Sequence, residues 1–299
     1  MKFLLLGASG QVGTELRRRL PALGDVTCAT RTGVLDDGSP CLPLDFDSPH
    51  TLASLVDSVA PDVVVNAAAY TAVDRAEDDA AAAFRVNAEA PGVLADACAA
   101  RGAWLVHYST DYVFNGQGTR PYREDDPVAP LGVYGASKLA GEQAIQASGA
   151  RHLIFRTAWV YAAHGHNFLR TMLRLSAERD ELRVVDDQVG SPTPASLIAD
   201  VTASVVRAQA GESGLWHLTA AGATSWAGFA SAIVDGAVER GLIARAPRVV
   251  PIRSEDYPTR ARRPAYSVLD TTRLARDFGI RPMSWQDGLG SVLKEIQCA

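Results

Sequence analysis

The chain has 299 residues, 47% of them hydrophobic, so it can bury a large core, and its length suggests about two domains. A formal net charge of −5 argues against a basic surface for nucleic acid or an anionic membrane. The apolar run 3–6 is too short for a signal peptide, and no stretch of about twenty apolar residues is present to span a membrane. We therefore expect a cytoplasmic protein that binds neither nucleic acid nor membrane.

The first predicted strand, residues 3–6, leads directly into a glycine-rich turn and then a helical pattern over 14–20. The turn reads Gly7-Ala8-Ser9-Gly10-Gln11-Val12-Gly13, with glycines at spacings of three and three. Such glycines let the backbone turn tightly and approach a pyrophosphate at a helix amino end. The turn differs by one insertion from the commoner Gly-x-Gly-x-x-Gly pattern. It predicts a dinucleotide site, with a plain strand-to-helix turn as the alternative.

The second predicted strand, residues 26–30, ends in Arg31, where an acidic residue would bind the ribose of NAD. A guanidinium at that position favours the 2′-phosphate of NADP, although a surface arginine is an equal alternative. A third short strand over 41–44 is followed by Asp45 and Phe46, of which Asp45 is placed to bond the adenine edge.

Three alanines, Ala67, Ala68 and Ala69, come just after the strand predicted at 62–65. Their small side chains leave room for a cofactor to lie across the end of that strand. A helix is predicted over 84–101, and the strands predicted at 104–108 and 152–156 complete a set of five or six. Strands that alternate with helices predict a doubly wound, Rossmann-like parallel sheet.

The strand at 104–108 delivers Ser109, Thr110 and Asp111 to the carboxyl edge of the sheet, where ligands of such sheets bind. Tyr134 and Lys138 stand four residues apart, so on a helix they share one face. A nearby ammonium favours the phenolate and makes a tyrosine a better acid, and Thr110 would offer a hydroxyl to the same carbonyl oxygen. The spacing alone is weak, because an amphipathic helix with a solvated lysine has it too. Together with the glycine turn it predicts a hydride-transfer site.

With these features, the chain resembles the extended short-chain dehydrogenase/reductase superfamily, and within it the dTDP-4-dehydrorhamnose reductase family. The resemblance covers nearly the whole chain and rests on the glycine turn and on the segments 109–114, 156–161, 187–193 and 262–264. It implies NADPH-dependent reduction, with NADH as a further possibility, of the 4-keto group of dTDP-4-dehydro-L-rhamnose to dTDP-L-rhamnose.

The resemblance also implies roles for single residues. Tyr134 would be the proton donor, and Lys138 its partner and a ligand of the nicotinamide ribose. Trp159 would form a wall of the sugar site, unless it is a core tryptophan. The remaining roles are sugar contacts for Thr110 and Asp111, pyrophosphate contacts for Gln11 and Val12, and adenosine contacts for Ala67 to Ala69.

The division expected is a cofactor domain at 1–166, to which 182–208 returns, and a smaller substrate lobe built mainly from 167–181 and 209–299. In that lobe Arg262 and Arg263 form a cationic pair that suits a nucleotide diphosphate, with two solvated arginines as the alternative. The nucleotide sugar is the expected partner, and the chain is expected to act as a monomer or homodimer.

No metal is expected. Some relatives use carboxylates at three places to bridge a dimer through magnesium, and here Glu15 and Glu295 stand at the outer two. The middle position falls in 194–197, which contains no acid. His164 and His166 lie in a glycine-containing loop without a third ligand.

Two other functions are compatible with the same sequence features. An epimerase or dehydratase on this scaffold would recycle a retained NAD, but similar dehydratases have an acid after the Thr-Asp pair, where this chain has Tyr112. The non-catalytic regulatory subunit of methionine adenosyltransferase also resembles these reductases. The presence of Tyr134, Lys138 and Thr110 favours an enzyme.

Overall fold

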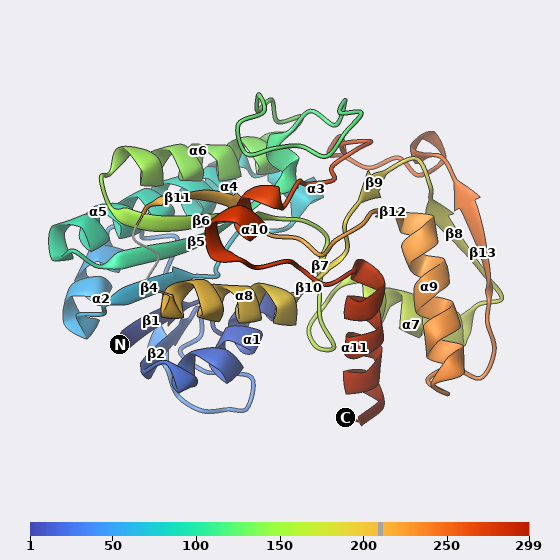
Figure 1. The fold of residues 1–299 in the computed structure, drawn as a ribbon, viewed down its shortest axis with the longest axis horizontal. Coiled ribbons are helices and arrows are strands. Elements are labelled where there is room, and N and C mark those ends of the chain that lie inside the picture. Colours follow the sequence, from blue (N-terminus) through green and yellow to red (C-terminus); the bar gives the residue numbers. More distant parts are fainter. Residues whose placement is uncertain (209–211, 299) are drawn as a thin grey trace.

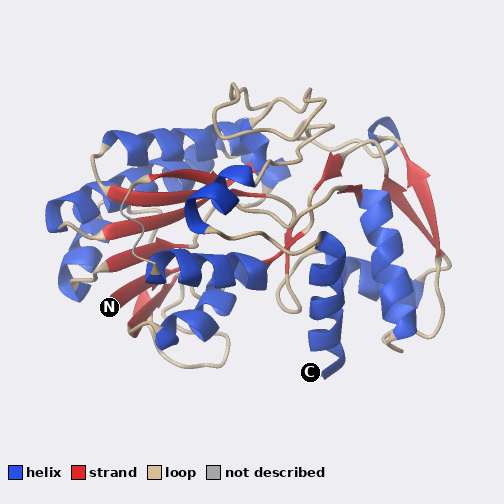
Figure 2. Cartoon of the chain, in the orientation of Figure 1, coloured by secondary structure: helices blue, strands red, loops and turns tan. Residues whose placement is uncertain are grey.

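A parallel sheet runs through the larger part of the molecule in the computed structural model, which describes residues 1–208 and 212–298. Helices cover both faces of this sheet (Figures 1 and 2). Within the described residues it has seven strands, in the spatial order β11 (Gly214–His217), β6 (Arg151–Thr157), β5 (Trp104–Thr110), β4 (Val63–Asn66), β1 (Lys2–Leu6), β2 (Asp25–Thr30) and β3 (Leu42–Pro43). The doubly wound, Rossmann-like sheet expected from the sequence is confirmed.

Strand β1 lies in the middle of the sheet, between β2 on one side and β4 on the other. The chain first adds strands beyond β2 and then crosses to β4, so the strand order reverses beside β1. In doubly wound sheets the crevice at this reversal, outside the carboxyl ends of the strands, is where ligands bind. The glycine turn after β1 and the residues after β4 and β5 all lie at this edge.

The two faces of the sheet are covered because the side chains of each buried strand alternate between them. In β1, Phe3 and Leu5 pack with the helices of one face, and Leu4 and Leu6 with those of the other, and all four are fully buried. Burying one such side chain contributes about 1.5–3 kcal/mol. The first face carries α1 (Gln11–Arg19) and α8 (Ala195–Arg207), and the second carries α2 (Thr51–Val59), α5 (Ala90–Arg101) and α6 (Val133–Ala147).

The helix expected over 84–101 is interrupted. Residues Arg85–Glu89 form a single π turn, η2, between α4 (Ala80–Phe84) and α5. Pro91, in the first turn of α5, lacks the amide hydrogen that would continue regular hydrogen bonding. The side chain of Asn87 donates to the backbone oxygen of Tyr70 and to Oγ of Ser137, so the π turn fixes α6 against the loop after β4.

A smaller lobe follows the sheet domain and lies beside its carboxyl edge (Figure 1). Its parallel strand pair β8 and β13 packs against α9, and α9 packs against α7. One core cluster continues from the first face of the sheet into this lobe through Tyr161, Phe229 and Trp285. The larger elements are α7 (Phe168–Glu178), β8 (Glu181–Val185), α9 (Trp226–Glu239), β13 (Arg248–Ile252) and α11 (Trp285–Cys298).

Several short elements connect the two parts. Strand β7 pairs in parallel with β10, and β9 pairs antiparallel with β12. None of the helices in 1–208 and 212–298 is long and apolar enough to cross a membrane. The short elements are η1 (Leu20–Ala22), α3 (Val73–Ala76), η3 (Asp111–Val113), β7 (Val160–Tyr161), β9 (Val189–Gly190), β10 (Thr193–Pro194), β12 (Thr224–Ser225), η4 (Ser254–Asp256) and α10 (Thr272–Phe278).

Two strand placements differ from the expectation. Strand β11 adds to the edge of the main sheet beside β6, with Leu215 opposite Ile154, although the sequence placed it in the smaller lobe. Of the segment 182–208, helix α8 packs on α1 in the sheet domain, whereas β8 pairs with β13 outside the sheet. Pairing partners far apart in the chain decide both placements, and a hydrophobic pattern does not identify them.

Candidate active site

The glycine turn between β1 and α1 is shaped by two close backbone approaches. Gly7 has φ +75°, and a Cβ there would lie 2.7 Å from the amide nitrogen of Ala68. A Cβ on Gly13 would lie 2.1 Å from the Gly7 carbonyl oxygen, so both positions require glycine. The amino end of α1 starts at Gln11 with no side-chain cap and no acidic residue in its first turn. This leaves backbone amides at a helix amino end, the arrangement that binds a pyrophosphate.

The three alanines after β4 lie half-buried beside this turn. Ala67 and Ala68 provide the backbone atoms that approach Gly7. Ala67 contacts the core on one face of the sheet and Ala68 the core on the other. The segment therefore places three small side chains next to the glycine turn, and such a surface suits the adenosine half of a cofactor.

The residues that follow β2 and β3, namely Arg31, Asp45 and Phe46, are less closely tied to the glycine turn. Arg31 is exposed, and within the described residues no hydrogen bond or ion pair holds its guanidinium. Asp45 is exposed and bound to its own turn, since its carboxylate accepts from the amide of Asp47. Hydrogen bonds from Ser48 and Asp47 lower the pKa of Asp45. Phe46 is half-buried against the core.

Strand β5 ends at Thr110, next to the start of helix α6. Glu77 fixes that start, because its Oε1 accepts from the amide of Val133 at 2.8 Å. Tyr134 is the second residue of α6, and the Thr110 hydroxyl lies close enough to act on its pKa. Burial raises the pKa of Tyr134, and the Thr110 hydroxyl lowers it in part, so the side chain is a protonated phenol at neutral pH.

Lys138 lies one turn further along α6 and is buried, with 1% of its surface exposed. Its Nζ is 3.0 Å from Nε2 of His107, in the middle of β5. Burial lowers the pKa of Lys138 to about 8, while the Glu142 carboxylate acts in the opposite direction. The structure thus brings together Thr110, Tyr134 and Lys138. His107 was missed, although it is a polar residue within an otherwise apolar strand.

Asp111 follows Thr110 and is buried. The Thr110 hydroxyl donates to its Oδ1 at 3.1 Å, whereas its Oδ2 has no partner within the described residues. Burial raises the pKa of Asp111 to about 6, and the nearby Ser267 and Thr110 hydroxyls only partly oppose this rise. The buried hydroxyls of Ser109 and Thr157, at the same edge, also lack partners in the described part of the chain. A bound polar ligand would supply hydrogen-bond partners for these unpaired polar atoms.

Trp159 has φ +48°, a left-handed conformation that is strained for a large side chain. Its ring stacks on Trp226 of α9 with a centroid distance of 3.5 Å and an interplanar angle of 4°. Gly190 makes room for it, since a Cβ there would lie 2.5 Å from the indole. Trp159, expected to form a wall of the sugar site, therefore packs against a second tryptophan from the smaller lobe. Trp226 was not identified because it is far from Trp159 in sequence.

The two arginines expected to meet a diphosphate are placed differently. Arg262 is exposed. The guanidinium of Arg263 donates to Asp74 at 2.7 Å. Arg263 therefore ties its loop to α3, at the edge of the sheet domain.

The two carboxylates discussed as metal ligands, Glu15 and Glu295, are bound by arginine side chains. Glu15 is buried and accepts from Arg18, Arg19 and His164 at 2.8–3.0 Å. Burial raises the pKa of Glu15, but the His164 hydrogen bond and the two arginine charges lower it overall. Arg18 also binds Glu295 at 2.8 Å.

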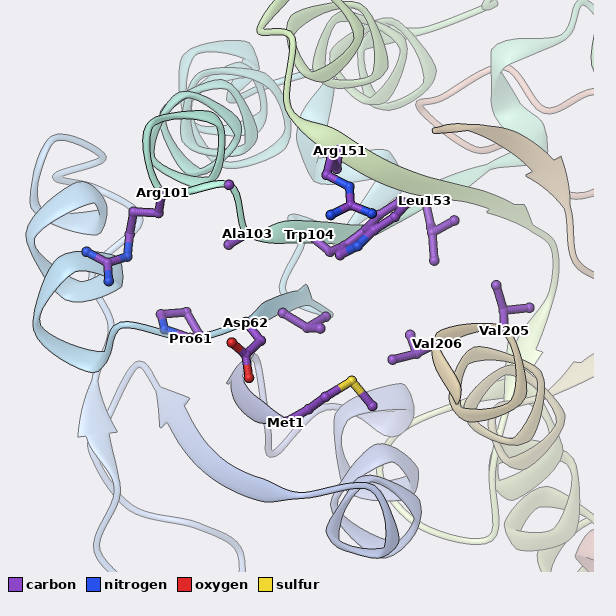
Figure 3. Close-up of a pocket in the computed structure, with 12 residues that line it drawn as sticks. Met1, Pro61, Asp62, Arg101, Ala103, Trp104, Arg151, Leu153, Val205 and Val206 are labelled. Carbon is purple, nitrogen blue, oxygen red and sulfur yellow. The ribbon is translucent and has the colours of Figure 1, made fainter. Parts of the chain in front are cut away.

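A cavity of about 380 Å³ opens at the opposite edge of the sheet, at the amino ends of the strands (Figure 3). Asp62, Trp104 and Arg151 line it, with the Arg151 guanidinium 4.3 Å from the Trp104 ring centroid. None of the candidate site residues is among those that line it. The reactive side chains lie at the carboxyl edge, where ligands of this class of sheet bind.

A doubly wound sheet with a glycine turn after β1, a threonine at the end of β5 and a Tyr-x-x-x-Lys pair on α6 defines an extended short-chain dehydrogenase/reductase. Residues 1–298 match the family model described as RmlD substrate binding domain. The chain belongs to this family.

Individual relatives agree over full length. The dTDP-4-dehydrorhamnose reductase of Burkholderia thailandensis is 50% identical over 307 residues, covering 99% of each chain. The crystal structure of a dTDP-4-dehydrorhamnose reductase from Clostridium acetobutylicum matches with a TM-score of 0.90 and 36% identity, covering 99% of this chain and 100% of that one. The Bacillus anthracis reductase, solved in complex with NADP, matches with a TM-score of 0.89 and 32% identity, covering 98% and 99%.

Proposed function

We propose that this protein uses NADPH to reduce the 4-keto group of dTDP-4-dehydro-L-rhamnose, giving dTDP-L-rhamnose. Full-length relatives at up to 50% identity carry that activity in their names. The observation that carries the proposal within this chain is the placement of Tyr134 and the buried Lys138 one turn apart on α6, beside the end of β5 where Thr110 stands. A cytoplasmic location and action as a monomer or homodimer belong to the same proposal.

The cofactor would lie across the carboxyl edge between β1 and β4. The glycines at 7, 10 and 13 and the uncapped amino end of α1 suit its pyrophosphate. Gln11 and Val12 would lie along the pyrophosphate and Ala67 to Ala69 along the adenosine. Arg31, exposed and without a bound partner among the described residues, would reach the 2′-phosphate. When bound, NADPH supplies a hydride to the carbonyl carbon.

The protein's own residues act on the carbonyl oxygen. Tyr134 gives its phenolic proton to that oxygen, so hydride and proton together convert the ketone to an alcohol. With the substrate bound, the Thr110 hydroxyl, which donates to Asp111 Oδ1 in this structure, would turn to donate a second hydrogen bond to the same oxygen and position it. A charged Lys138 stabilises the phenolate that Tyr134 becomes, and a positioned acid of this kind contributes about 10²–10⁴-fold to the rate.

The sugar nucleotide would lie between the sheet edge and the smaller lobe. Asp111, with one carboxylate oxygen left unpaired within the described chain, would accept from a sugar hydroxyl. Trp159, supported by Trp226, would form the apolar wall of the sugar site. Arg262 would meet the diphosphate, and Arg263 would shape the loop through Asp74. In this proposal residues 1–166 with α8 bind the cofactor, and the smaller lobe binds the substrate.

A retained-NAD epimerase or dehydratase is less well supported. The residue after Asp111 is Tyr112, whose ring meets that of Tyr134 edge-on at 5.5 Å. A buried neutral phenol, whose pKa burial raises to about 12, does not supply the base that elimination needs.

One assay separates the possible functions. The purified protein is given NADPH and either dTDP-4-dehydro-L-rhamnose or another nucleotide keto-sugar, with cofactor oxidation followed by absorbance and products identified by NMR. The proposal expects one NADPH oxidised for each dTDP-L-rhamnose formed. An isomerised or dehydrated product without net oxidation would indicate the epimerase or dehydratase. Absence of any product would indicate a non-catalytic subunit.

A further inference from the structure

Three buried polar side chains form a continuous line behind the candidate active site. Asn66 at the end of β4 and His107 in β5 are register partners in the sheet, and Lys138 on α6 lies over them. Their exposed fractions are 1%, 0% and 1%. Because each is cut off from water, its hydrogen bonds within this line decide its protonation state.

This line of hydrogen bonds begins at the backbone amide of Ala68, which can only donate. The amide of Ala68 donates to Oδ1 of Asn66 at 3.2 Å, which fixes the orientation of the Asn66 side chain. The Nδ2 group of Asn66 then faces Nδ1 of His107 at 3.2 Å and must donate to it. Burial lowers the pKa of His107 well below its usual value, so the ring is neutral. A neutral ring that accepts at Nδ1 carries its hydrogen on Nε2.

The Nε2 hydrogen of His107 points at Nζ of Lys138, 3.0 Å away. An ammonium has only donors, whereas a neutral amine has a lone pair that accepts. Every contact in the line is satisfied only when Lys138 is neutral. Exchanging the positions of Oδ1 and Nδ2 of Asn66 does not satisfy these contacts either, because the NH₂ group would then face the Ala68 amide, which is also a donor.

The charged groups around Lys138 do not reverse this conclusion. Glu142, on the same helix, favours the ammonium. Its two carboxylate oxygens, however, are bound by the guanidinium of Arg156 from β6, at 2.9 and 2.6 Å. Tyr134, also on α6, is a neutral phenol that burial keeps protonated.

We propose that Asn66 and His107 are positioning residues that stabilise the neutral amine of Lys138 in the cofactor-free protein, so that NADPH binding is coupled to proton uptake by Lys138. The phosphates of the cofactor bring negative charge, and its ribose hydroxyls are acceptors, so both favour the ammonium. The proton comes from solvent and stays on Nζ, where it stabilises the Tyr134 phenolate. The inference rests on the proposed function, in which Lys138 serves the nicotinamide ribose.

The same line of hydrogen bonds connects Ala68, beside the glycine turn where the cofactor would lie, to Lys138. A Cβ on Gly7 would meet the Ala68 amide nitrogen at 2.7 Å, so the glycine turn packs against the residue that orients Asn66. Movement of this turn when a pyrophosphate binds would therefore reach Lys138 through Ala68, Asn66 and His107.

The first test reads the histidine directly, without cofactor or substrate. Nitrogen-15 NMR of histidine-labelled protein distinguishes the two neutral tautomers and the imidazolium. The proposal expects the Nε2–H tautomer for His107, and Asn66→Asp should convert it to the Nδ1–H form, because a carboxylate accepts where the amide donated. The resonance is assigned with His107→Gln or, if that variant does not fold, by substituting the other five of the six histidines. An Nδ1–H tautomer or an imidazolium in the wild-type protein would overturn the proposal.

The second test measures proton uptake by calorimetry of NADPH binding in buffers of different ionisation enthalpy, at a pH just above 8. Wild-type protein should take up a large part of about one proton. Asn66→Asp and His107→Gln should take up much less, because each leaves Lys138 facing an acceptor and already charged. His152→Gln is the matched control, a buried histidine at the start of β6 whose ring bonds the Ala150 carbonyl, and it should keep the uptake.

The two possible failures can be told apart. NADPH binding with proton uptake but no turnover of the keto-sugar would contradict the proposed function and leave this inference standing. Turnover with no proton uptake on binding, or equal uptake in wild type and Asn66→Asp, would overturn the inference and leave the function standing.

Discussion

The guanidinium of Arg156 binds both carboxylate oxygens of Glu142, with Nε 2.9 Å from Oε1 and Nη2 2.6 Å from Oε2. Both side chains are at most 5% exposed. The pair joins β6 to α6, the helix that carries Tyr134 and Lys138, and so helps to hold these two residues at the sheet edge.

Removing one member of this pair should therefore destabilise the fold strongly. We expect Glu142→Gln to lower the free energy of unfolding by about 3–5 kcal/mol, because it leaves a buried guanidinium without its counter-charge. Urea unfolding provides the measurement. Glu178→Gln, which breaks an exposed pair with Arg174 on α7, should cost about 0.3–0.5 kcal/mol. Equal losses in the two variants would show that the buried pair is not a structural tie.

Tyr134→Phe should lower kcat by about 10²-fold or more, the usual effect of losing a general acid, and leave NADPH binding nearly unchanged. Steady-state kinetics and a fluorescence titration of NADPH give the two quantities. Tyr257→Phe, at a tyrosine that is 60% exposed, serves as the control and should behave like wild type. Near-wild-type turnover in Tyr134→Phe would remove this residue from the mechanism.

Arg31→Ala should raise KM for NADPH by about tenfold or more and leave KM for NADH almost unchanged. A charge-assisted hydrogen bond to the 2′-phosphate is worth about 1.5–3 kcal/mol, and NADH has no such phosphate. Arg183→Ala, at an exposed arginine on β8, is the control. Equal changes for the two cofactors would assign Arg31 a structural role.

Much of the site could be predicted because its parts are local in sequence. The glycine turn is one continuous segment, Thr110 ends a recognisable strand, and Tyr134 and Lys138 are one helical turn apart. For the same reason the continuous apolar run from Phe3 to Leu6 was enough to predict a buried strand.

What could not be predicted depends on pairing between distant segments. His107 meets Asn66 only through the register of β4 and β5. The Trp159 stack needs a residue of α9, and Arg263 is tied to Asp74, 189 positions earlier in the chain. The position of β11 likewise follows from a free edge on β6 rather than from its own pattern.

Stability should depend on pH through Lys138. Burial lowers its pKa from 10.5 to about 8, so between these values the unfolded chain binds more protons than the folded one. The free energy of unfolding must then rise with pH across this range, by about 3 kcal/mol from this group. The measurement is the difference between wild type and Lys138→Met in urea unfolding at several pH values. A difference that stays flat from pH 8 to 10.5 would mean that the lysine is charged in the folded protein.

Activity should not require a metal ion. Glu15 is already bound by Arg18, Arg19 and His164, and the segment Pro194–Leu197 contributes no carboxylate. Tyr134, Lys138 and Thr110 can act on the carbonyl oxygen without a Lewis acid. Turnover should therefore be the same in EDTA as in Mg²⁺, with an assay after dialysis as the check. Activity that EDTA abolishes and Mg²⁺ restores would contradict this prediction.

The most direct test of the central claim follows the hydride. The protein is given NADPH in which both hydrogens at C4 of the nicotinamide are deuterium, together with dTDP-4-dehydro-L-rhamnose, and the product is examined by NMR and mass spectrometry. The account predicts deuterium on C4 of the sugar in dTDP-L-rhamnose, one for each NADPH oxidised, with formation slowed about 10²-fold or more in Tyr134→Phe. A sugar product without deuterium, or NADPH left unoxidised while the keto-sugar is transformed, would contradict it.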